Sequence, residues 1–121
     1  MIAQTYLIFY VADQTRSVEF YKAILQTEPI LDEPGMTEFL LMDNLILGVM
    51  PAAGIVKLHG DAMPDPAQAQ GIPRSELYLM VDDPVAYHQR ALAAYDWGHE
   101  VAYCLDLDGH MLAFAHNQAK S

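Results

Sequence analysis

The sequence predicts an α+β fold made of two copies of a β-α-β-β-β module. The first observation is a pair of similar hairpins. Residues 36–50 indicate two strands joined at Asp43-Asn44, and residues 99–116 indicate two strands joined at the Asp-x-Asp-Gly turn that ends in Gly109. The second observation is that a strand and an amphipathic helix precede each hairpin. The same order of elements occurs twice, which indicates an internal repeat.

The first module is assigned to residues 1–50. Residues 5–12, TYLIFYVA, form an apolar run of strand length, and Asp13 follows it as a helix N-cap. The next segment, QTRSVEFYKAIL, places apolar side chains at helical spacing. An extended piece then ends at Pro34-Gly35, and the first hairpin closes the module.

The second module is assigned to residues 74–121, after a linker at residues 51–73 that is rich in Ala, Gly, Gln and Pro. The strand SELYLMV leads to Asp83, an N-cap, and to Pro84 at the first helical position. The helix VAYHQRALAAY and the second hairpin follow.

The second module is shorter than the first between the helix cap and the final turn. The missing length falls at residues 94–98, where the first module has its post-helix strand. Either that strand is vestigial in the second module, or a disordered loop is absent from the sequence.

Composition restricts the partners that the protein can have. A hydrophobic content of 53% is ample for a single globular domain, and no run approaches the roughly 20 apolar residues of a membrane span. We expect a cytoplasmic protein without a disulfide framework, because Cys104 is the single cysteine and no leader segment is recognisable. A net charge of −10 disfavours nucleic acid and favours cationic small molecules.

These modules resemble the vicinal-oxygen-chelate superfamily, which contains the glyoxalases, the extradiol dioxygenases and the bleomycin-resistance proteins. The resemblance rests on DQTRSVEFYKAIL, DPVAYHQRALAAY and WGHEVAYCLDLDGHMLAFAH, which stand at the expected places. It implies that the curved sheets of the two modules form a half-barrel cleft, commonly completed by a second subunit. A homodimer is therefore expected.

Metal-dependent members of the superfamily place ligands on the first and last strands of each module. The resemblance carries these positions to Tyr6, Gly48, Glu76 and Ala113. Only Glu76 offers a good donor for a divalent ion, whereas a catalytic site needs about three protein ligands. We therefore expect neither a metal nor another cofactor.

The resemblance and the two-residue period of strands together define the expected cleft face. Strand parity places Tyr and Met side chains beside Glu76 on this face and aliphatic or Phe side chains on the other. Such a surface can accept an aromatic or cationic small molecule by stacking, cation–π contact and charge. The expected ligand-binding residues are Tyr6, Tyr10, Glu76, Tyr78, Trp97, His99 and Tyr103. As alternatives, the Tyr face meets a second subunit, Glu76 is an exposed strand start, and Trp97 is a rim residue.

The remaining polar residues of the second hairpin suggest no catalytic set. Strand parity turns His110 and His116 away from the Ala113 face, and Asp106 and Asp108 suit a turn in which they hold backbone N–H groups.

The favoured function is a metal-free small-molecule binding protein of the glyoxalase/bleomycin-resistance type, such as a drug-sequestering resistance protein. The alternatives are a glyoxalase-like lyase, isomerase or transferase that holds a metal through unconventional ligands or acts without one, and an interaction module whose own side chains fill the cleft.

Overall fold

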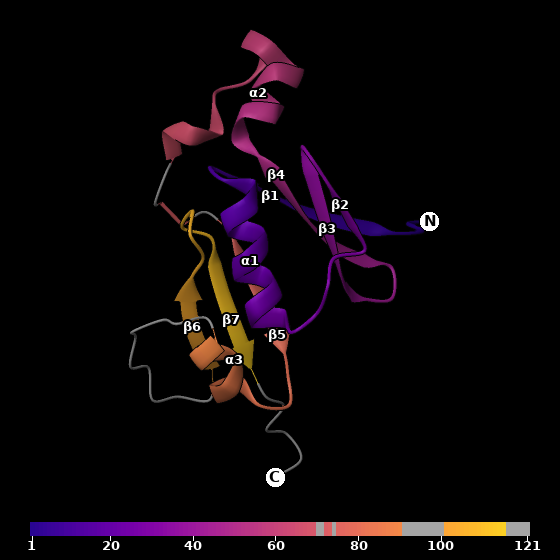
Figure 1. Ribbon diagram of the computed structural model, residues 1–121, viewed down its shortest axis with the longest axis vertical. Coiled ribbons are helices and arrows are strands. Elements are labelled where there is room, and N and C mark those ends of the chain that lie inside the picture. Colours follow the sequence, from indigo (N-terminus) through magenta and orange to yellow (C-terminus); the bar gives the residue numbers. More distant parts are fainter. Residues whose placement is uncertain (70–71, 74, 91–100, 116–121) are drawn as a thin grey trace.

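Two β-sheets pack around helix α1 (Gln14–Leu25) in the computed structural model, which describes residues 1–69, 72–73, 75–90 and 101–115 (Figure 1). Sheet A has the strand order β1-β4-β3-β2, and sheet B has the order β5-β7-β6. The strands of sheet A are β1 (Thr5–Val11), β2 (Leu31–Glu33), β3 (Met36–Met42) and β4 (Leu45–Pro51). Those of sheet B are β5 (Glu76–Met80), β6 (Val101–Leu105) and β7 (Met111–Ala115).

The two modules share one topology, which confirms the predicted α+β duplication. In each module the first strand pairs in parallel with the last, so β1 lies beside β4 and β5 lies beside β7. A parallel pair requires a crossover connection, and α1 and α3 (Pro84–Arg90) begin those connections. The hairpins β3–β4 and β6–β7 are antiparallel. Sheet B is the smaller sheet in the described part of the chain, and residues 91–100, where the shortening was expected, lie outside it.

Helix α1 forms where the sequence predicts it. The side chain of Asp13 accepts a hydrogen bond from the backbone N–H of Arg16 at 3.1 Å, which caps the first turn. The helix ends at Gln26, whose φ of 55° is left-handed. Its buried side chains recur every three or four residues: Ser17, Val18, Tyr21 and Ile24.

The connection between the modules contains helix α2 (Ala52–His59) and the short helices η1 (Gly60–Ala62) and η2 (Pro66–Ala69). The sequence analysis predicts no helix in this linker. Helix α2 is short and includes Gly54, so its periodicity is weak, and it forms where Ile55 and Val56 become partly buried beside β1 and β4. The connection therefore lies over the carboxyl end of β1 (Figure 1).

One hydrophobic core joins the two modules. Side chains alternate along each strand, and the inward ones meet α1 and each other. The core includes Phe9, Val11, Tyr21, Ile24, Phe39, Leu47, Val49, Leu77, Leu112 and Phe114. This is the aliphatic and Phe face that strand parity predicts. None of the helices in the described residues has the length and apolar character needed to cross a membrane.

Candidate functional site

The strand face opposite the core is apolar, and the side chains that β1 and β5 place on it are exposed, whereas Ile46 on β4 and Ala113 on β7 are buried. On β1 the core-facing Phe9 is 3% exposed, whereas Tyr6 and Tyr10 on the other face are 48% and 38% exposed. On β5 the same face presents Tyr78, at 50%, and Met80. We call these side chains, together with Ile8, the tyrosine face. Exposed apolar surface of this kind is typical of interaction sites.

The expected ligand-binding residues lie on both sheets. In the strand registers Tyr6 is opposite Ile46 and Tyr10 is opposite Met50. Glu76 is the exposed first residue of β5. Among the described residues, no side-chain hydrogen bond or ring contact joins Tyr6 or Tyr10 to Glu76 or Tyr78. In a single chain these four side chains are therefore exposed on two sheets, and no interaction of these kinds brings them together in one binding site.

The other expected residues belong to the second hairpin and the segment before it. In sheet B, Tyr78 and Tyr103 are both opposite Ala113, one from each side of β7. Trp97 and His99 lie outside the described residues.

The metal-ligand positions implied by the resemblance do not form a metal site in the described structure. A side chain added at Gly48 would place its Cβ 3.1 Å from Cγ1 of Ile8 and 3.3 Å from Sδ of Met36, so apolar atoms already fill that space. Ala113 is completely buried. No group of three or more His, Cys, Asp or Glu side chains gathers anywhere in the described part of the chain. Glu76 and the Tyr6 phenol alone do not supply a catalytic ligand set.

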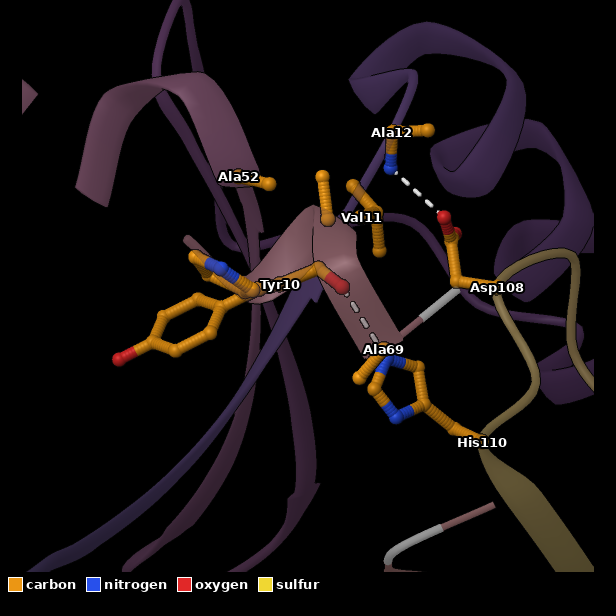
Figure 2. A pocket seen from close by; sticks show the side chains of 9 residues that line it. Tyr10, Val11, Ala12, Ala52, Ala69, Asp108 and His110 are labelled. Atoms are coloured by element: carbon orange, nitrogen blue, oxygen red, sulfur yellow. Dashed lines mark hydrogen bonds between the residues drawn. The ribbon is translucent and has the colours of Figure 1, made fainter. Parts of the chain in front are cut away.

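A pocket of about 70 Å³ lies at the carboxyl end of β1, beneath η2 and the start of α2 (Figure 2). Tyr10 and Ala12 line it from β1 and the residue after it, and Asp108 and His110 line it from the second hairpin. Figure 2 shows the Tyr10 ring extending away from Asp108 and His110. The sequence predicts Tyr10 in the site, but it predicts a turn role for Asp108 and turns His110 away from the Ala113 face.

His110 is fixed between the two modules. Its imidazole ring stacks on Phe9 with ring centroids 4.2 Å apart and an interplanar angle of 4°. Nε2 lies 3.1 Å from the carbonyl oxygen of Tyr10, and Nδ1 lies 3.4 Å from the hydroxyl of Ser75. A carbonyl oxygen only accepts hydrogen bonds, so Nε2 carries the proton and donates it, while Nδ1 accepts from Ser75 in the neutral ring.

Asp106 and Asp108 hold backbone N–H groups, as predicted. One oxygen of Asp106 accepts from the N–H groups of Asp108 and His110 at 2.9 and 2.8 Å, and Gly109 supplies the positive φ of the turn at 91°. The other oxygen accepts from the Tyr21 hydroxyl at 2.6 Å. Asp108 accepts from the N–H of Ala12 at 2.7 Å. The turn of the second module thus caps the strand–helix junction of the first.

A second, apolar pocket of about 50 Å³ lies on the α2 side of Tyr10, where Ile55, Val56 and Met63 line it together with His59. Sites for drug-sized molecules usually measure about 300–1,000 Å³. The two pockets beside Tyr10 are therefore large enough for part of such a ligand only.

No protein-family model matches the sequence. No curated protein matches it either. Solved structures do match. A glyoxalase-related enzyme from Fulvimarina pelagi is 18% identical, with a TM-score of 0.71 over 95% of this chain and 88% of that chain. A glyoxalase/bleomycin resistance protein/dioxygenase from Nocardioides is 20% identical, with a TM-score of 0.71 over 97% of this chain and 84% of that chain.

A lactoylglutathione lyase from Agrobacterium tumefaciens is 16% identical, with a TM-score of 0.66 over 96% of this chain and 94% of that chain. These likenesses extend over nearly the whole chain and both of its modules. At such low identities they establish the fold, and they agree with the resemblance found in the sequence. The chain therefore has the same fold as these glyoxalase and bleomycin-resistance structures.

Proposed function

We propose that the protein is a cytoplasmic, metal-free small-molecule binding protein that sequesters an aromatic or cationic compound. The main support is the side-chain set at the metal-ligand positions of the superfamily. Ile8 and Met36 crowd Gly48, and Ala113 is buried, so this face carries the fold of the superfamily without a ligand set for an ion. A face of Tyr and Met side chains instead suits stacking and cation–π contact.

Electrostatics favours a cation as the ligand. The chain has sixteen Asp and Glu residues and six Lys and Arg residues. In the described structure the ion pairs join Lys22 to Glu19 and Glu28, and Glu76 has no cationic partner. A ligand ammonium or guanidinium group would give Glu76 a charge partner that the described residues do not provide.

A homodimer would complete this site. The tyrosine face is exposed in the single chain, and β1 and β5 are each at the edge of their sheet. In the proposed arrangement the tyrosine face of one copy faces that of the other, with Trp97, His99 and Tyr103 contributing at its mouth. Each small pocket beside Tyr10 then opens into a larger shared cleft.

A thermal-shift titration of the metal-stripped protein tests the proposal. The probes are a panel of aromatic, cationic antibiotics including bleomycin, and separately Ni²⁺, Zn²⁺ and Mn²⁺. A compound at 100 times its Kd should stabilise the fold by about 2.7 kcal/mol. We expect the shift to shrink in Glu76→Gln and to persist in Glu19→Gln, an exposed carboxylate on the outer side of α1.

Two results would contradict sequestration. Stabilisation by one of the metal ions with no effect of any drug would favour the alternative function, a lyase, isomerase or transferase with unconventional ligands. Turnover of a bound compound, followed by mass spectrometry, would do the same. An equal loss of drug binding in Glu19→Gln would exclude a local role for Glu76.

A further inference from the structure

A pocket of about 390 Å³ lies between the modules at the C-terminal end of α1. We call it the inter-module pocket. Leu25, Thr27 and Leu41 line it from the first module, and Leu79, Val81 and Asp82 line it from the second. Its volume falls within the usual range for small-molecule sites, and both modules contribute aliphatic residues to a lining that also has polar surface.

The internal repeat relates this pocket to the junction at the other end of α1. Aligning Asp13 with Asp83 places Ala12 over Asp82, and aligning Asp43 with Asp108 places Leu41 over Asp106. In this alignment the end of β5 corresponds to the end of β1, and the residues around Leu41 correspond to the Asp106 turn. The inter-module pocket therefore corresponds to the junction between the Asp106 turn and the end of β1.

The two counterparts are filled differently. At the end of β1, Asp106 accepts the Tyr21 hydroxyl, and Asp108 accepts the N–H of Ala12. At the end of β5, an aliphatic side chain, Leu41, occupies the position of Asp106, and Asp82 stands in place of Ala12. The pocket at the end of β1 thus measures only about 70 Å³ and its carboxylate, Asp108, accepts from the N–H of Ala12, whereas the inter-module pocket measures about 390 Å³.

The charges around the pocket favour a cation. Asp82 is exposed and has no ion-pair partner among the described residues. The nearby cation Arg90 is held elsewhere, because its guanidinium lies 4.1 Å over the Tyr87 ring and its Nε donates to the carbonyl oxygen of Ile24 at 3.0 Å. A ligand cation would therefore meet the carboxylate without competition from this side chain.

We infer that the inter-module pocket binds a small amphipathic organic cation, with its apolar part against Leu25, Leu41 and Leu79 and its ammonium group at Asp82. Strands and helices of both modules of the one chain already form this pocket. It is also separate from Glu76, and its existence does not rest on sequestration at the tyrosine face.

The test is a titration with phenethylammonium chloride followed by ¹H–¹⁵N NMR, with the uncharged analogue 2-phenylethanol in parallel. We expect the largest shifts at the amides of Thr27, Leu41, Val81 and Asp82. Asp82→Asn should weaken phenethylammonium binding by about two- to fivefold and leave 2-phenylethanol binding unchanged, since only an exposed charge pair is lost. Thr27→Trp, at an exposed position on the rim, should fill the pocket and weaken both.

Asp61→Asn in η1 is the matched control, because it removes an exposed carboxylate far from the pocket, and it should bind both probes as the parent does. The inference is overturned if phenethylammonium binds with unchanged affinity to both single variants, Asp82→Asn and Thr27→Trp. Shifts confined to Tyr6, Tyr10 and Tyr78 would also overturn it and would place the cation on the tyrosine face. Glu76→Gln separates the two sites, because it should leave the Asp82-dependent binding intact.

Discussion

At the scale of single residues, Asp106 determines how the two modules meet. Its side chain is only 6% exposed and accepts hydrogen bonds from two backbone N–H groups and from the Tyr21 hydroxyl. A buried carboxylate is costly unless donors surround it. The Tyr21 hydroxyl comes from the other module. Its hydrogen bond to Asp106 therefore stabilises the folded protein more than the same bond would at the surface.

Tyr21→Phe tests this role because it removes one donor and keeps the ring in the core. We expect it to lower the free energy of unfolding by about 1–3 kcal/mol, the usual range for leaving a buried polar group without a partner. Urea denaturation measures the loss. Tyr78→Phe, at a half-exposed ring, should change stability by less than about 0.5 kcal/mol. If Tyr21→Phe and Tyr78→Phe lower the free energy of unfolding equally, the hydrogen bond between Tyr21 and Asp106 does not stabilise the fold.

Sequence patterns predicted part of the residue-level picture. The Asp-x-Asp-Gly spacing is local, so it predicts that Asp106 and Asp108 hold backbone N–H groups. Asp106 holds those of its own turn, whereas Asp108 holds that of Ala12 in the other module. The contact of Asp106 with Tyr21, and that of His110 with Tyr10, joins residues far apart in the chain. Helical and strand periodicity relate only residues close together in the chain, so they cannot predict such contacts.

At the scale of elements, the second module holds α1 at both ends with groups of opposite charge. Asp108 lies at its N-terminal end, where its carboxylate accepts from Ala12. Arg90 lies at its C-terminal end, where its guanidinium donates to the carbonyl oxygen of Ile24. Both match the helix macrodipole, which favours anions at the N-terminus and cations at the C-terminus.

Arg90→Met is expected to destabilise the protein by about 0.5–1.5 kcal/mol, because it removes the hydrogen bond to α1 while keeping an apolar stem beside Tyr87. Arg16→Met is the control: it removes the same charge from an exposed position on α1, the helix whose C-terminal end Arg90 contacts. Thermal unfolding of the two variants at equal ionic strength gives the comparison. If Arg16→Met loses more stability than Arg90→Met, the change in net charge, rather than the contact of Arg90 with the C-terminal end of α1, explains the destabilisation.

The elements with strong periodicity were predictable, and the irregular ones were not. Strand β1 and helix α1 have a clear apolar run, a clear helical spacing and an N-cap between them, so their sequence defines them locally. Helix α2 has neither length nor a side-chain cap, and its folding depends on the neighbouring ends of β1 and β4. Strand parity also placed Tyr6, Tyr10 and Tyr78 on the exposed face, although it could not show which of them meet.

At the scale of the whole molecule, the two modules share a core on one side of their sheets and expose Tyr and Met side chains on the other. The core side includes the intermodule hydrogen bonds and the stack of His110 on Phe9. The other side has exposed rings on both sheets, and in the described part of the chain β1 and β5 are edge strands. Exposed apolar rings beside free strand edges favour association with a second copy over a lone chain in water.

Tyr6→Lys should therefore separate the proposed homodimer. A lysine ammonium on the tyrosine face would have to lose water on association, which is unfavourable without a partner, whereas the single chain leaves this position half exposed. We expect sedimentation velocity to give a dimer for the parent protein and a folded monomer for Tyr6→Lys. Leu58→Lys places the same charge on α2, at a side chain that is already exposed, and should remain dimeric. A dimeric Tyr6→Lys protein would place the interface elsewhere, and a monomeric parent would mean that each chain binds its ligand alone.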